Sequence, residues 1–96
     1  MRFRFTVRAE RDIEEIGDYI AQDNPVRAVT FIEALTEKCH HLIEQPESAP
    51  LRREFGDDVR MTVFGRYLIF YSFDTDELTI IRVIHSARNW MSGPAS

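Results

Sequence analysis

The chain has 96 residues, of which 44% are hydrophobic, and a formal net charge of −4. This length allows one domain with a single core, which we expect to span residues 1–96. The single cysteine excludes an internal disulfide, and the sequence has neither a signal-peptide core nor an apolar run of membrane-spanning length, so we expect a cytoplasmic protein. The acidic balance argues against non-specific nucleic-acid binding, which depends on Lys/Arg-rich surfaces.

The first predicted elements are a strand and a helix. Residues 2–7 alternate arginine with apolar residues, which is typical of a half-buried strand. Residues 9–23 then change to a helical period. The apolar face of this helix consists of Ala9, Ile13, Ile16 and Ile20. Acidic residues occupy its opposite side, and we expect them to be solvated.

A second helix is predicted from Pro25 to about residue 44. Asn24 is a good N-cap, and Pro25 stands at the first helical position, where its missing N–H has no cost. The apolar stripe of this helix consists of Ala28, Phe31, Leu35, Cys39 and Leu42. We expect the two helices to form an antiparallel αα-hairpin.

Three short strands follow a polar loop. They are expected at residues 59–64, 66–73 and 78–85, separated by turns at Gly65 and at residues 74–77. The predicted order is therefore β-α-α-β-β-β, which is an α+β fold with an antiparallel sheet and the N-terminal αα-hairpin packed on one face. We expect the tail, residues 86–96, to be partly flexible.

Both faces of the predicted sheet are apolar. The middle strand offers Tyr67, Ile69 and Tyr71 on one side, and Leu68 and Phe70 on the other. Two helices can cover only one face of four strands, and large exposed apolar patches mark interaction sites. We therefore expect a partner chain to cover part of the second face. Alternatively, the loop at residues 44–58 and the C-terminal tail cover it.

Arginines and one histidine gather at the end of the last strand, at Arg82, His85 and Arg88. Arg60 and Arg66, on or near neighbouring strands, could converge on the same end of the sheet. Such a group could support RNA cleavage, because arginines hold a scissile phosphate and imidazole transfers a proton near neutral pH. Alternatively, the histidine is structural and the arginines are solvated or paired with acids. Strand alternation places His85 opposite Arg82 unless the chain turns.

No metal or cofactor site is expected. Cys39, His40 and His41 are consecutive on a helix, where neighbours diverge by about 100°, so they cannot bind one ion together. Cys39 belongs to the core stripe, which indicates a buried and inert thiol. Nucleotide-binding and hydrolase motifs do not occur. Trp90 either caps the core or serves as an interface anchor.

Several segments together resemble the ParE/RelE superfamily of bacterial toxins. The resemblance covers residues 2 to about 90, includes the element order, and is carried by residues 9–20, 24–25, 31–42, 50–56, 64–71 and 82–88. It implies the toxin of a type II toxin–antitoxin pair, assembled as a hetero-oligomer with a ParD-like antitoxin. ParE-type members inhibit DNA gyrase, whereas RelE-type relatives cleave mRNA on the ribosome.

The composition favours the ParE-like branch. RelE-type nucleases resemble basic proteins with a late tyrosine or histidine at the phosphate, whereas this chain is acidic, has one lysine and has no tyrosine after Tyr71. We therefore expect an inhibitor that binds gyrase without catalysis, cofactor, metal, membrane or direct specific nucleic-acid contact. The predicted contact residues are Arg60, Arg66, Phe70, Arg82, His85, Arg88 and Trp90.

Two alternatives stay open. In a ribosome-dependent endoribonuclease, Arg60 and Arg82 would hold the phosphate and His85 would act as acid or base. A binding protein without toxic activity would serve only as an antitoxin partner.

Overall fold

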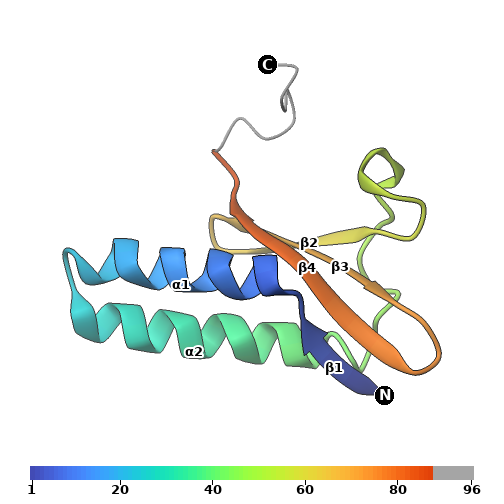
Figure 1. Cartoon of the computed structure of the whole chain (residues 1–96), viewed down its shortest axis with the longest axis horizontal. Helices are drawn as coiled ribbons and strands as arrows, with labels where there is room; N and C mark the ends of the chain where they lie inside the picture. The colour runs from blue at the N-terminus through green and yellow to red at the C-terminus, as the bar shows by residue number, and fades with distance from the viewer. Residues whose placement is uncertain (88–96) are drawn as a thin grey trace.

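The computed structural model of the chain describes residues 1–87, which form two α-helices and a four-stranded sheet (Figure 1). The elements in chain order are β1 (Arg2–Phe5), α1 (Val7–Ala21), α2 (Pro25–His41), the 3-10 helix η1 (Arg53–Phe55), β2 (Arg60–Phe64), β3 (Tyr67–Phe73) and β4 (Glu77–His85). The predicted α+β class and the order of the elements are confirmed.

Side-chain caps explain where both helices begin. The Thr6 hydroxyl accepts a hydrogen bond from the Ala9 N–H at 2.9 Å, so α1 begins at Val7, earlier than predicted. The same hydroxyl donates to the Ile81 carbonyl at 2.9 Å, which ties the cap to β4. The Asn24 side chain accepts from the Arg27 N–H at 3.0 Å, as expected for the N-cap of α2.

The sheet has the order β1-β4-β3-β2 and is mixed. Strands β2, β3 and β4 form the predicted antiparallel meander, but β1 pairs with β4 in parallel, so the prediction of an antiparallel sheet is wrong at this edge. The reason lies in the connections. The helical hairpin returns the chain to the end where β1 starts, and the two reversals of the meander then bring β4 back to the same direction.

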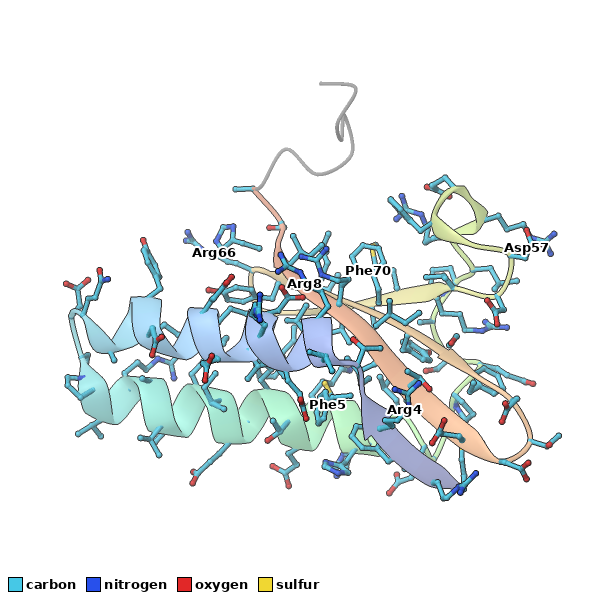
Figure 2. The ribbon with its side chains drawn as sticks, in the orientation of Figure 1. Arg4, Phe5, Arg8, Asp57, Arg66 and Phe70 are labelled. Carbon is cyan, nitrogen blue, oxygen red and sulfur yellow. The ribbon has the colours of Figure 1, made fainter. Side chains whose placement is uncertain are left out.

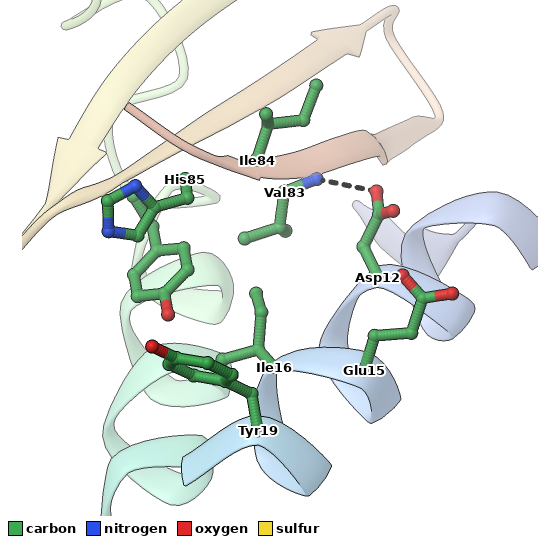
Figure 3. A pocket seen from close by; sticks show the side chains of 8 residues that line it. Asp12, Glu15, Ile16, Tyr19, Val83, Ile84 and His85 are labelled. Atoms are coloured by element: carbon green, nitrogen blue, oxygen red, sulfur yellow. Dashed lines mark hydrogen bonds between the residues drawn. The ribbon is translucent and has the colours of Figure 1, made fainter. Parts of the chain in front are cut away.

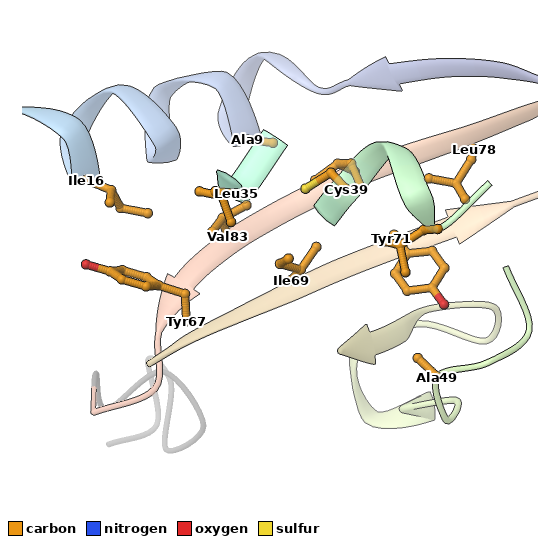
Figure 4. Close-up of a cluster of buried hydrophobic side chains, with 12 residues drawn as sticks. Ala9, Ile16, Leu35, Cys39, Ala49, Tyr67, Ile69, Tyr71, Leu78 and Val83 are labelled. Atoms are coloured by element: carbon orange, nitrogen blue, oxygen red, sulfur yellow. The ribbon is translucent and has the colours of Figure 1, made fainter. Parts of the chain in front are cut away.

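The core lies between the helices and the face of the sheet that they cover, here called the inner face (Figure 4). Its largest fully buried side chains are Leu35, Cys39, Ile69, Tyr71, Leu78 and Ile80. Leu35 and Cys39 were predicted from the helical stripe of α2, and their burial is confirmed. The Tyr71 hydroxyl donates to the Pro46 carbonyl at 2.7 Å, which holds the loop after α2 against the core.

The opposite face of the sheet, here called the outer face, has a smaller core of its own. Val59, Leu68, Phe70 and Ile84 are buried there. The Phe55 ring of η1 meets the Phe70 ring edge-on, with 5.1 Å between centroids. The loop therefore covers part of this face, as one of the two alternatives predicted. The C-terminal tail lies outside the described residues.

A β-bulge changes how β4 presents its side chains. Phe70 pairs with Arg82 and Tyr71 pairs with Ile80, which leaves Ile81 as the extra residue. Ile81 packs against the outer-face cluster, and Arg82 borders a hollow on the same side. The bulge thus places two consecutive residues on the outer face.

Asp12 closes the edge of β4 that β1 leaves open. Strand β1 ends at Phe5, opposite Ile80, so β4 continues without a neighbouring strand. The Asp12 carboxylate accepts a hydrogen bond from the Val83 N–H at 3.0 Å and binds the Arg82 guanidinium at 2.7 and 3.1 Å. Asp12 is only 3% exposed, so the prediction that the acidic residues of this helix are solvated is wrong for Asp12.

We predict that Asp12→Ala lowers the free energy of unfolding by about 3 kcal/mol, because it leaves Arg82 and the Val83 N–H without their shared acceptor. Urea denaturation measures the effect. Glu14→Ala, at an exposed position of the same helix, is the matched control and should cost less than about 0.5 kcal/mol. Equal effects of the two substitutions would contradict the structural role of Asp12.

We predict that the Cys39 thiol is inert in the folded protein, because burial raises its pKa to about 12. A disulfide reagent at about pH 8 should label the thiol quickly only after denaturation. Since the folded state holds this proton more tightly than the unfolded state, stability should fall as the pH rises from 9.0 toward about 12. Rapid labelling of the native protein would contradict the burial.

Candidate functional site

The structure brings Arg66 and His85 to one end of the sheet. Arg66 lies in the turn between β2 and β3 (Figure 2), and its carbonyl accepts a hydrogen bond from the Ser86 N–H at 2.7 Å. His85 is the last residue of β4 and pairs with Tyr67, the first residue of β3. This part of the predicted strand-end group is therefore assembled.

Arg82 is held by the protein itself. Its guanidinium binds the buried Asp12 carboxylate, yet its side chain keeps 30% of its surface exposed. The same side chain borders a hollow of about 260 Å³ on the outer face. That hollow is lined by Phe55, Val59, Phe70, Ile81, Arg82 and Ile84. The outer face thus combines an apolar depression with a guanidinium whose position is fixed.

Arg60 does not join this group. Arg60 begins β2 and pairs with Tyr71. It stands four residues before Phe64, the end of the strand, which places it about 13 Å along β2 from the turn that contains Arg66. Its guanidinium donates to the Ala49 carbonyl at 2.7 Å and lies over the Phe73 ring at 5.5 Å. The suggested convergence of Arg60 with the strand-end residues is therefore wrong, because the register carries it toward the loop after α2.

His85 lies on the inner face, opposite Arg82, as strand alternation predicted. Its ring meets the Tyr67 ring edge-on at 5.1 Å. Its Nδ1 accepts a hydrogen bond from the Ala87 N–H at 3.0 Å, so the proton of the neutral ring belongs to Nε2. The two side chains therefore leave β4 on opposite faces, and the Arg82 guanidinium reaches the edge of the strand, where it binds Asp12 of α1.

A second hollow, of about 430 Å³, opens on the inner face between α1 and the end of β4 (Figure 3). It is lined by Asp12, Glu15, Ile16, Tyr19, Tyr67, Val83, Ile84 and His85. Burial raises the pKa of the Tyr67 hydroxyl, and the neighbouring Tyr19 raises it further, so Tyr67 is a neutral phenol near neutral pH. The hollow was not predicted from the sequence, because the acidic residues of this helix were expected to be solvated.

Two predicted contact residues, Arg88 and Trp90, lie outside the described residues. Within residues 1–87, no group of three or more His, Cys, Asp or Glu side chains could hold a metal ion. No helix in this described part is long and apolar enough to cross a membrane.

Comparison with known sequences identifies relatives along most of the chain. Residues 3–90 match the family described as the ParE toxin of the type II toxin–antitoxin system parDE. A candidate toxin of Sinorhizobium fredii, Y4kP, is 30% identical over 89 residues, which are 93% of this chain and 92% of the relative.

Solved structures share the fold. A chain of the chromosomal ParDE system from P. aeruginosa superposes with a TM-score of 0.75 at 19% identity, covering 88% of this chain and 95% of that one. A chain of the RelBE2 toxin–antitoxin complex from Mycobacterium tuberculosis gives a TM-score of 0.64 at 28% identity, with the same coverage of 88% and 95%. Both neighbours come from toxin–antitoxin systems.

Proposed function

This chain belongs to the ParE toxin family of type II toxin–antitoxin systems, and we propose that it acts by binding DNA gyrase and inhibiting it. The toxin role and an antitoxin partner are properties of that family and of the complexes that share its fold. Gyrase as the target, and a ParD-like antitoxin that neutralises the toxin in a cytoplasmic hetero-oligomer, are the specific proposals.

The main support for this proposal is that the fold does not bring the three candidate nuclease residues, Arg60, Arg82 and His85, together at one site. Arg82 binds Asp12, Arg60 binds the carbonyls of the loop after α2, and the His85 ring lies on the face opposite Arg82. A general acid or base must lie within hydrogen-bond reach of the group it serves. Because the fold already engages both arginines and holds Arg60 away from His85, these residues fit a surface that binds a protein better than one that cleaves a phosphodiester.

The outer face offers the contacts for a protein target. Phe70 and Ile84 form an apolar floor, Arg82 stands at its border, and Arg66 lies exposed at the end of the sheet. Arginines and aromatic residues that surround an apolar depression are typical of interface anchors. Arg88 and Trp90, which follow β4 in the chain, stay predicted contacts of the same target.

One observation favours an endoribonuclease as the second candidate function. The RelBE2 neighbour is more similar in sequence than the ParDE neighbour, at 28% against 19% identity. His85 also borders the inner hollow, where its ring edge can be reached from solvent. On that alternative, His85 would transfer the proton during cleavage of mRNA on the ribosome.

A supercoiling assay with antitoxin-free protein and purified gyrase tests the proposal. We expect inhibition, accumulation of cleaved DNA, and relief by the antitoxin. If folded protein left gyrase active and instead cut mRNA on programmed ribosomes, the gyrase proposal would be wrong. Activity in neither assay would indicate a protein that only binds its antitoxin.

We predict that His85→Ala keeps gyrase inhibition within about twofold, because no proton transfer is involved and because His85, first predicted as a contact, lies on the inner face, away from the outer-face contacts. Arg66→Glu and Arg88→Glu should each weaken inhibition by about tenfold, since rim charges steer and hold a partner. Arg11→Glu, which makes the same charge change at an exposed position of α1, is the control and should match the wild type. Loss of all activity in His85→Ala alone would support the nuclease.

A further inference from the structure

The inner hollow has the chemistry of a receptor for a positively charged side chain. Two tyrosines, one histidine and two carboxylates line it, and none of its eight described lining residues is lysine or arginine. The remaining lining is aliphatic. A cation gains from aromatic faces and from a carboxylate in the same cavity.

One of the two carboxylates is available to a ligand. Asp12 is neutralised by Arg82 and by Arg8, whose Nε lies 3.6 Å from its Oδ1. Glu15 is exposed and has no ion pair among residues 1–87. Figure 3 shows the Glu15 carboxylate next to that of Asp12, whereas the Tyr19 ring lies beyond Ile16 on the other side of the hollow. The free negative charge therefore stands at one side of the hollow and the aromatic ring at the other.

The tyrosines and aliphatic residues of the hollow suit the methylene stem of a cationic side chain. Tyr19 is 71% exposed, unusually so for a large aromatic residue, whereas the neighbouring Tyr67 is only 8% exposed. Ile16 and Val83 line the cavity with aliphatic surface. Arginine buries its methylene stem on apolar surface while its guanidinium stays near water and a counter-charge.

The end of β4 limits how a partner can reach the hollow. Beyond Ile80, where the pairing with β1 ends, the Ile81 carbonyl accepts from the Thr6 hydroxyl and the Val83 N–H donates to Asp12. A strand in line with β1 therefore has no place on this edge. A partner's side chain instead enters from solvent beside Tyr19, which is exposed, and His85, which is partly exposed.

We propose that the inner hollow is a docking site for an arginine side chain of the antitoxin, which enters it from solvent beside Tyr19 and His85. The inference rests on the antitoxin partnership and not on gyrase as the target. It assigns the inner hollow to the neutralising partner, while the outer face and its arginines serve the target.

The first test uses a short peptide as the probe. An acetylated pentapeptide, Ser-Val-Arg-Val-Ser amide, is titrated into the isotope-labelled, antitoxin-free protein and followed by NMR. Its counterpart with citrulline has the same shape without the charge. We expect shifts at Tyr19, Tyr67 and His85, and about fivefold weaker binding of the citrulline peptide. Equal binding of the two peptides, or shifts confined to the outer face, would overturn the proposal.

The second test uses the antitoxin itself. Glu15→Gln and Tyr19→Ala alter only exposed side chains, so both variants should fold, and each should weaken antitoxin binding by about fivefold to tenfold in calorimetry. Glu14→Gln, one position away and outside the hollow, is the control and should stay within about twofold.

If the variants lost gyrase inhibition but kept antitoxin affinity, the target would occupy the hollow and the proposal would be wrong. If gyrase proved not to be the target, the altered antitoxin affinity would still stand.

Discussion

The buried carboxylate of Asp12 is the constraint on which the rest of the structure depends. Strand β1 is too short to cover the whole edge of β4, and a bare strand edge inside a small domain leaves polar backbone groups without partners. Asp12 supplies an acceptor in place of a strand. A buried charge needs a counter-charge, and Arg82 provides it at 2.7 Å. This contact therefore fixes the position of α1 relative to the end of β4, and it fixes the direction of the Arg82 guanidinium.

This arrangement gives the two faces of the sheet different chemistry. On the outer face, the bulge at Ile81 and the pairing with Asp12 hold Arg82 beside an apolar depression. On the inner face, the same closure leaves the exposed Glu15 without an ion pair among residues 1–87, at a cavity of about 430 Å³. On the two proposals made above, the outer face with its guanidinium binds the target and the anionic inner hollow binds the antitoxin, through separate contacts. Both surfaces lie along β4, so a contact at one is close to the other.

Local patterns in the sequence predicted the parts of the fold that depend on neighbours in the chain. The stripe through Leu35 and Cys39, the cap at Asn24 and the strand alternation at His85 all follow from helical or strand periodicity, and the structure has them. The family resemblance agreed with the element order that these patterns predicted, and it added the toxin role. The cap at Thr6 was missed because the alternation of residues 2–7 predicted a strand that continues to Val7, whereas the Thr6 hydroxyl accepts from the Ala9 N–H and begins the helix.

What the sequence could not predict depends on contacts between distant segments. The parallel pairing of β1 needs the direction of a strand more than 70 residues later. The burial of Asp12 depends on where β1 stops. The sequence of a polar helical face does not show which of its acids will be buried. Arg60 was placed wrongly because only the register of β2 against β3 shows which end of the sheet it occupies. The inner hollow combines Tyr19 with Tyr67 and His85, which no spacing rule connects.

The most direct measurement of the central claim is a double-mutant cycle between Asp12 and Arg82 in urea unfolding. Asp12→Asn, Arg82→Gln and the double substitution keep the shapes of both side chains while removing their charges. If the pair holds the edge of β4, the coupling free energy should be about 2 kcal/mol, and the double variant should be little worse than either single one. A coupling below about 0.5 kcal/mol would mean that the two residues act independently, and it would contradict the account.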